Sequence, residues 1–151
     1  MFIVEATTVI NAPVSAVWKT LTHLDDYQAW STMLHYEGGK LVEGETLELR
    51  LTLPGGTNYR FSPEVKVLEP NKRFVWKAVT RIEGIFDGEH SFELIPFGDQ
   101  QTRLINREVY TGILSPIVKR LPMMKGAAAG FAAMNAEIKA HAEKNVLKGT
   151  P

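Results

Sequence analysis

The chain has 151 residues, of which 44% are hydrophobic, and its 17 basic and 17 acidic side chains give a formal net charge of zero. This length predicts a single domain over residues 1–151, and the apolar content excludes an intrinsically disordered chain. The lack of a basic surplus argues against nucleic-acid binding, and the absence of cysteine excludes disulfides, thiolate metal sites and a cysteine nucleophile.

The N-terminal part of the chain predicts a strand followed by two short helices. Residues 2–10 are rich in β-branched side chains, which favour strands. Pro13 suits a first helical turn, and Val17 and Leu21 then recur at helical spacing. A second short helix is expected over residues 24–29.

The middle of the chain has the pattern of successive antiparallel strands. In residues 47–53, leucine alternates strictly with polar side chains, which is typical of a half-buried strand. Turn signals at residues 54–56 and 70–71 separate this strand from those that follow. Further strands are expected at residues 59–68, 73–78, 86–97 and 102–110.

The last part of the chain predicts a long helix. Phe131, Met134 and Ile138 lie on one helical stripe within the Ala-rich residues 115–144. Because Pro122 would kink a helix interior, we expect a short helix or bent turn before it and the long helix after it. A run of strands followed by a helix indicates an α+β fold rather than a parallel α/β sheet.

No segment has the pattern of a targeting signal or a membrane span. Residues 1–10 are apolar but lack a basic stretch and a cleavage site. The longest apolar stretch, residues 125–136, is broken by Gly126 and Gly130 and is too short to span a bilayer. We therefore expect a cytoplasmic protein without stable membrane insertion.

The last predicted hairpin brings polar side chains to the inner face of the sheet. With a three-residue loop at 98–100, His90 lies opposite Glu108 and Phe92 lies opposite Asn106, with Cβ atoms about 5 Å apart. A five-residue loop would place His90 opposite Asn106 instead. Because buried polar groups are costly unless paired, the pattern predicts a mutual network or a wet cavity.

The preceding hairpin predicts an aromatic wall beside these polar groups. Around the turn at residues 70–71, Val65 and Val67 can lie opposite Trp76 and Phe74. Trp76 is then expected to neighbour Gly88 on the next strand, where no side chain fills the space. This makes Trp76 the best candidate among the tryptophans for lining a pocket.

Four pieces of the sequence form a recognisable pattern along nearly the whole chain. They are Ile10-Asn11-Ala12-Pro13 with Val17-Trp18, Tyr27 and Trp30; Glu69-Pro70 with Phe74 and Trp76; Gly88 and His90-Ser91-Phe92 with Thr102, Arg103, Leu104, Glu108 and Gly112; and Gly130-Phe131, Met134-Asn135, Ile138-Lys139 and Glu143. In their order and spacing they resemble the START-like superfamily, often called SRPBCC, in its branch of small polyketide cyclase/dehydrase-like domains.

The resemblance implies a helix-grip fold, in which a curved antiparallel sheet of about six to seven strands wraps around a long C-terminal helix. Two short helices follow the first strand and close one end. Members of the superfamily enclose a cavity for lipids, polyketides or other apolar molecules. They share no universal catalytic triad, so the fold alone does not establish an enzyme.

The predicted ligand-binding side chains line the inner face of the sheet and the covering helix. They are Trp76, His90, Phe92, Asn106, Glu108, Tyr110, Phe131 and Met134. His90 and Glu108 are the candidate catalytic pair, because a carboxylate can hold an imidazole in the tautomer that acid–base catalysis of a cyclisation or dehydration needs. The alternative is a structural pair that joins two strands or bonds a ligand. Asn106 is a candidate for orienting a ligand carbonyl.

The sequence offers no pattern for a metal or a cofactor. His23, His35 and His141 lie far apart without the spacing of metal ligands, and no glycine-rich loop precedes a helix as phosphate binding would require. We therefore expect neither a metal nor a cofactor.

Three functions remain open at this level. The first is binding or carriage of a small hydrophobic molecule, the second is a polyketide cyclase or dehydratase that uses His90 and Glu108, and the third is an interaction module like the chaperone activators of the superfamily. We expect a monomer or a homodimer. Lys119, Arg120 and Lys125 form a basic patch that is either a solvated face or a contact with an anionic membrane.

Overall fold

The structure is a computed structural model, and it describes residues 1–149. Its elements in chain order are β1 (Phe2–Ile10), α1 (Val14–Thr22), η1 (Leu24–Asp26), α2 (Tyr27–Trp30), β2 (Leu34–Gly39), β3 (Leu47–Thr52), β4 (Asn58–Phe61), β5 (Glu64–Glu69), β6 (Arg73–Val79), β7 (Asp87–Pro96), β8 (Thr102–Thr111), α3 (Ser115–Val118), η2 (Pro122–Met124) and α4 (Ala127–Leu147). Within the described chain, no helix combines the length and the apolar character that a membrane crossing requires.

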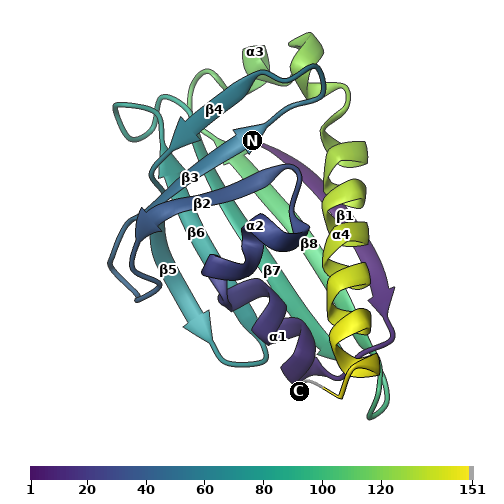
Figure 1. The fold of residues 1–151 in the computed structure, drawn as a ribbon. Coiled ribbons are helices and arrows are strands. Elements are labelled where there is room, and N and C mark those ends of the chain that lie inside the picture. The colour runs from purple at the N-terminus through teal and green to yellow at the C-terminus, as the bar shows by residue number, and fades with distance from the viewer. Residues whose placement is uncertain (150–151) are drawn as a thin grey trace.

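The strands form two antiparallel sheets that together make one curved surface. The larger sheet has the order β1-β8-β7-β6-β5, and the smaller one has the order β2-β3-β4. A single bridge between Thr46 and Glu64 links them. Figure 1 shows the smaller sheet folded across the larger one, with α1, α2 and α4 on the enclosed side. This is the helix-grip arrangement that the resemblance implies, with a sheet that does not close into a barrel.

The long helix α4 packs along the edge strand β1 and against α1 (Figure 1). Its buried side chains include Met134 and Ile138, as the helical stripe predicts. Phe131, on the same stripe, is only partly buried. The helix starts after Pro122, and the four-residue α3 lies before this proline, so the expected break is confirmed.

Two elements differ from the sequence prediction. The strand expected over residues 59–68 is divided into β4 and β5 by Ser62 and Pro63, because proline has no N–H to donate to a sheet ladder. The strand β2 was not predicted, since it ends in Gly38 and Gly39 and carries a bulge after Tyr36. These features hide the alternation by which a strand is recognised.

The register of the β7–β8 hairpin agrees with the three-residue loop. The amide of Phe97 donates to the carbonyl of Gln101 at 2.8 Å, and His90 lies opposite Glu108. In the β5–β6 hairpin, Val65 lies opposite Trp76 as predicted. Val67 lies opposite Val75 rather than Phe74, because a bulge between Val65 and Val67 shifts the pairing by one residue.

Candidate functional site

The three neighbouring strands β6, β7 and β8 place a row of candidate functional side chains across the sheet. Trp76 lies opposite His90, and His90 lies opposite Glu108 on its other side. From the helix side, the ring of Phe131 approaches His90 with a centroid distance of 5.2 Å. The row therefore sits between the centre of the sheet and the N-terminal turns of α4.

The imidazole of His90 is enclosed by aromatic rings. The residue is 5% exposed, and its ring stacks on Trp76 at 4.7 Å with an interplanar angle of 24°. Phe92 also lies at 4.7 Å, in a tilted arrangement. His90 Nδ1 lies 3.6 Å from Glu108 Oε2, whereas the buried Nε2 has no hydrogen-bond partner within residues 1–149.

Gly88 makes room for the carboxylate of Glu108. A Cβ atom at Gly88 would lie 2.6 Å from Glu108 Oε1, closer than real contacts allow. The predicted contact between Trp76 and Gly88 is wrong, because Gly88 pairs with Ala78 and Trp76 pairs with His90. The space above Gly88 is instead occupied by the side chain of Glu108, which comes from the neighbouring strand β8.

Tyr110 supports the Glu108 carboxylate. Its hydroxyl donates a hydrogen bond to Glu108 Oε2 at 2.8 Å. Burial of the phenol, together with the charge of Glu108 and this hydrogen bond, raises the pKa of Tyr110 well above its usual value. The phenol therefore stays protonated and remains a donor, while stacked Phe86 and Phe2 hold its ring.

A second polar chain runs from Asn106 to the edge strand. Asn106 Nδ2 donates to Asn135 Oδ1 at 3.0 Å, and Asn135 Nδ2 donates to the carbonyl of Ala6 at 3.1 Å and to Thr8 Oγ1 at 3.3 Å. Because a backbone carbonyl can only accept, it sets the orientation of both amides. Asn106 Oδ1 is left buried and without a partner in the described part of the chain.

The structure thus brings all eight predicted side chains into one cluster. Met134 joins it through its sulfur, which lies 3.6 Å from Asn106 Nδ2. Within the cluster, the free atom of Asn106 is an acceptor, so this geometry favours a ligand hydroxyl over the carbonyl that the sequence suggested.

The prediction missed one residue of this site, Asn135. Asn135 is fully buried and lies on the same helical face as Phe131 and Ile138, four residues after one and three before the other. A polar residue on an apolar stripe is the signal that could have identified it. Gly88 was noticed, but for the wrong neighbour.

Other polar features of the structure lie apart from this cluster. Two surface hollows of about 370 and 360 Å³ lie where η1 and α2 meet β2, and none of the eight predicted residues lines them. Among the residues described, no group of histidine and acidic side chains could hold a metal ion.

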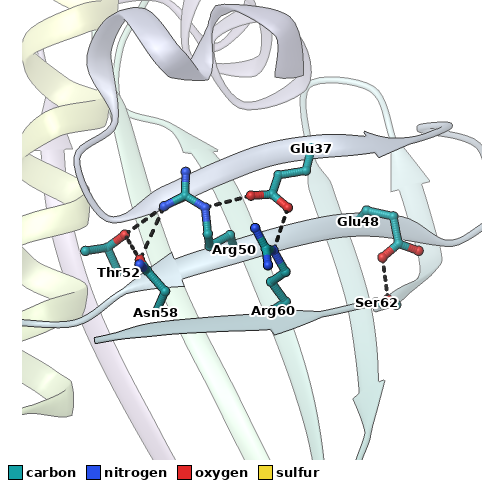
Figure 2. Close-up of polar contacts among 7 residues, drawn as sticks. All are labelled: Glu37, Glu48, Arg50, Thr52, Asn58, Arg60 and Ser62. Carbon is teal, nitrogen blue, oxygen red and sulfur yellow. Dashed lines mark hydrogen bonds and ion pairs between the residues drawn. The ribbon is translucent and has the colours of Figure 1, made fainter. Parts of the chain in front are cut away.

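The outer face of the smaller sheet carries a separate polar network (Figure 2). Glu37 accepts from Arg50 Nε at 2.6 Å and from Arg60 Nε at 3.1 Å. Arg50 also donates to Thr52 and Asn58. Hydrogen bonding to Arg50 is the main reason that the pKa of Glu37 is lowered. These groups satisfy one another at the surface.

Comparison with known proteins gives a family and a set of similar folds. A family model described as polyketide cyclase/dehydrase and lipid transport matches residues 1–143. The ZhuI aromatase/cyclase from Streptomyces sp. R1128 is similar with a TM-score of 0.73 and 16% identity, over 96% of this chain and 95% of that one. A protein from Nitrosomonas europaea has a TM-score of 0.74 and 15% identity, over 96% of both chains.

A third similar structure is a point mutant of norcoclaurine synthase from Thalictrum flavum. It has a TM-score of 0.70 and 10% identity, over 95% of both chains. At these identities the structural likeness shows the fold alone. Comparison with the sequences of curated proteins gives no match.

Proposed function

The chain belongs to the polyketide cyclase/dehydrase and lipid transport family, and from that premise we propose that it binds a small, mainly apolar molecule against His90, Trp76 and Asn106. Members of one fold can differ in function, so the proposal depends on the site itself. The site combines aromatic walls with a few polar atoms, which is the usual composition of a small-molecule pocket.

The observation that carries the proposal is that two of the five buried side-chain polar atoms without partners in the described residues, His90 Nε2 and Asn106 Oδ1, belong to this one cluster. A buried polar atom without a hydrogen bond costs roughly 1–3 kcal/mol. A ligand that bonds both atoms would remove this cost. The surrounding Trp76, Phe92 and Phe131 offer flat apolar surfaces to its carbon frame.

The same two atoms indicate which polar groups the ligand carries. With the N–H of His90 on Nδ1, towards the Glu108 carboxylate, the free Nε2 is an acceptor. Asn106 Oδ1 is also an acceptor. The matching ligand is therefore a flat apolar molecule with hydroxyl donors, such as a phenol or an enol. Its entry beside His90 requires the partly buried Phe131 ring to move.

The test compares two probes of similar shape. We expect 1,3-dihydroxynaphthalene to bind at least about tenfold more tightly than 1,3-dimethoxynaphthalene, because a site built for hydroxyl donors discriminates against a molecule that lacks them. Quenching of tryptophan fluorescence and the shift in melting temperature would measure binding. Native mass spectrometry of freshly purified protein would show whether a natural ligand of this class is retained.

His90→Phe is expected to weaken binding of the dihydroxy probe about tenfold, since it removes one acceptor while keeping the aromatic stack. The matched control is His35→Phe on strand β2, where the partly buried His35 lies outside the His90 cluster, and this variant should bind normally. Equal affinity for the two probes, or unchanged binding by His90→Phe, would refute the proposed site.

A second candidate function is proton-transfer catalysis, and the Nδ1–Glu108 geometry favours it. With Glu108 Oε2 at 3.6 Å from Nδ1, Nε2 would take a proton from an activated C–H bond, leaving the electron pair in an enolate. Deuterium exchange at the methylene group of 1-phenyl-1,3-butanedione, followed by NMR, tests this step. Glu108→Gln should slow the exchange about tenfold, whereas Glu89→Gln, an exposed change on the neighbouring strand β7, should not. Exchange at the uncatalysed rate would exclude this function for that substrate class.

A further inference from the structure

The segment between β8 and α4 exposes aliphatic side chains that a compact protein normally buries. Ile113 is 76% exposed, Ile117 is 62% exposed and Met123 is 52% exposed. Ile82, in the β6–β7 loop, is 62% exposed, and its loop is joined to this segment because the Ile113 amide donates to the Gly84 carbonyl at 3.0 Å. Single exposed apolar residues are ordinary, but several together indicate an interaction surface.

The same segment carries an asymmetric charge. The 28 residues from Val109 to Ala136 include the cations Lys119, Arg120 and Lys125 and no acidic residue. In a chain of zero net charge, this leaves the remainder with a net charge of −3. The three cations lie among the exposed aliphatic residues, and all three are exposed. The N-terminus of α4 follows directly and adds its positive helix dipole.

We propose that residues 113–125 form a docking surface for an anionic lipid bilayer. Ile113, Ile117 and Met123 would enter the boundary between headgroups and acyl chains, while Lys119 and Arg120 contact the headgroups. The short elements α3 and η2 are far too short to cross a bilayer, so the segment lies on the membrane surface rather than spanning it.

The composition of the surface favours a membrane over an acidic protein. Protein interfaces are usually centred on Trp, Tyr or Arg packed into a pocket, whereas residues 113–125 contain no aromatic residue and present scattered aliphatic side chains between cations. Protruding aliphatic groups need only a fluid apolar layer, and lysine or arginine needs only a negative surface potential.

The docking surface goes beyond the proposed function and does not depend on it. It lies at the same end of the molecule as the His90 cluster, because α4 begins two residues after Lys125 and Phe131 lies within its first turns. Figure 1 shows α3 at the end of the fold away from the C-terminal end of α4. Docking would place the His90 cluster next to the bilayer, a source of apolar molecules.

The experiment measures binding of the full chain to vesicles by flotation. One set of vesicles contains phosphatidylcholine alone, and the other contains phosphatidylcholine with about 30% phosphatidylglycerol, an anionic lipid. We expect binding to the anionic vesicles only, and we expect it to weaken in 0.5 M salt, roughly the regime where surface charges are screened. Lys119→Glu with Arg120→Glu should reduce affinity at least about 20-fold, because each cation contributes about fivefold near an anionic surface.

A second variant tests the apolar part. Ile117→Ser with Met123→Ser should reduce vesicle affinity at least about tenfold without changing the charge. The matched charge control is Lys72→Glu with Arg103→Glu. It changes a cation in the β5–β6 turn and one at the start of β8, at the other end of the antiparallel sheet from the β6–β7 loop. It should bind like the wild type, and so should His90→Phe, which separates this test from that of the ligand site.

Equal binding to neutral and anionic vesicles would overturn the proposal, as would equal losses in the control and the Lys119/Arg120 variant. Absence of vesicle binding would overturn it too, and capture of a purified acidic protein through residues 113–125 would then assign the surface to a protein partner. Circular dichroism and melting temperature verify that each variant is folded.

Discussion

The outer face of the smaller sheet and the His90 cluster both gather polar side chains, but they differ in how fully these are paired. In the network of Glu37, Arg50 and Arg60, each group has a hydrogen-bond partner at the surface (Figure 2). In the buried cluster, His90 Nε2 and Asn106 Oδ1 have none among the described residues. Unpaired polar atoms matter little in water and a great deal in a core. This incomplete pairing is the reason that we propose the His90 cluster, rather than the outer network, as the ligand site.

The largest effect should come from the buried amide chain. Asn135→Ala removes the acceptor of Asn106 Nδ2 and the donor to the Ala6 carbonyl, and it opens a cavity at a fully buried position. We expect a loss of roughly 2–4 kcal/mol in the free energy of unfolding, measured by urea denaturation. Asn58→Ala, which removes an exposed amide from the outer network, should cost less than about 0.5 kcal/mol. Similar decreases in the free energy of unfolding for the two variants would contradict the contrast between the buried cluster and the outer network.

His90→Phe should have the opposite sign. It removes an unpaired buried nitrogen and fits a ring between Trp76 and Phe92, so we expect a gain of roughly 0–1 kcal/mol in the free energy of unfolding. The same variant should lose binding of the dihydroxy probe, which is the trade-off typical of a functional site. A clear decrease in the free energy of unfolding would show that His90 stabilises the fold.

A smaller effect is expected at Glu37. Its pKa is lowered in the folded protein, mainly by hydrogen bonding to Arg50, so its contribution is present above the ordinary carboxyl pKa and is lost as the pH falls through the lowered value. Glu37→Gln should therefore flatten the acid side of the curve of stability against pH. At neutral pH it should cost less than Asn135→Ala and should respond to salt. If Glu37→Gln left the fall in stability at acid pH unchanged, the Glu37 carboxylate would contribute nothing to the pH dependence of stability.

The smallest change in stability is expected for Gly88→Ala. The added Cβ meets the end of the flexible Glu108 side chain, which can move away, and alanine is intrinsically better than glycine in a strand. Stability should change by less than about 1 kcal/mol, but the carboxylate should move away from His90. Nitrogen NMR of the imidazole would detect this move as a change of tautomer. Gly38→Ala, where the nearest atom is 3.9 Å away, should leave the His90 spectrum unchanged.

Much of the site could be predicted where the chain is locally constrained. The loop at residues 98–100 is short, and a short hairpin loop determines the pairing of its strands. The positions of His90 opposite Glu108 and of Phe92 opposite Asn106 follow from a three-residue loop together with the shared apolar face of the two strands. A five-residue loop would have placed His90 opposite Asn106, and the structure confirms the first register. The β6–β7 connection, residues 80–86, is longer and leaves the register open, which is why Trp76 was assigned the wrong neighbour.

The sequence by itself determined the α+β class, the long helix after Pro122 and the family, because these depend on periodicity, proline geometry and local pattern. It also limited the β7–β8 hairpin to two registers, between which the structure decided. Only the tertiary structure decided how β1 and α4 meet, and therefore that Asn135 orients Asn106. It also decided that Glu108 fills the space above Gly88. These contacts join residues far apart in the chain. No local rule determines them, because they arise only when several elements pack together.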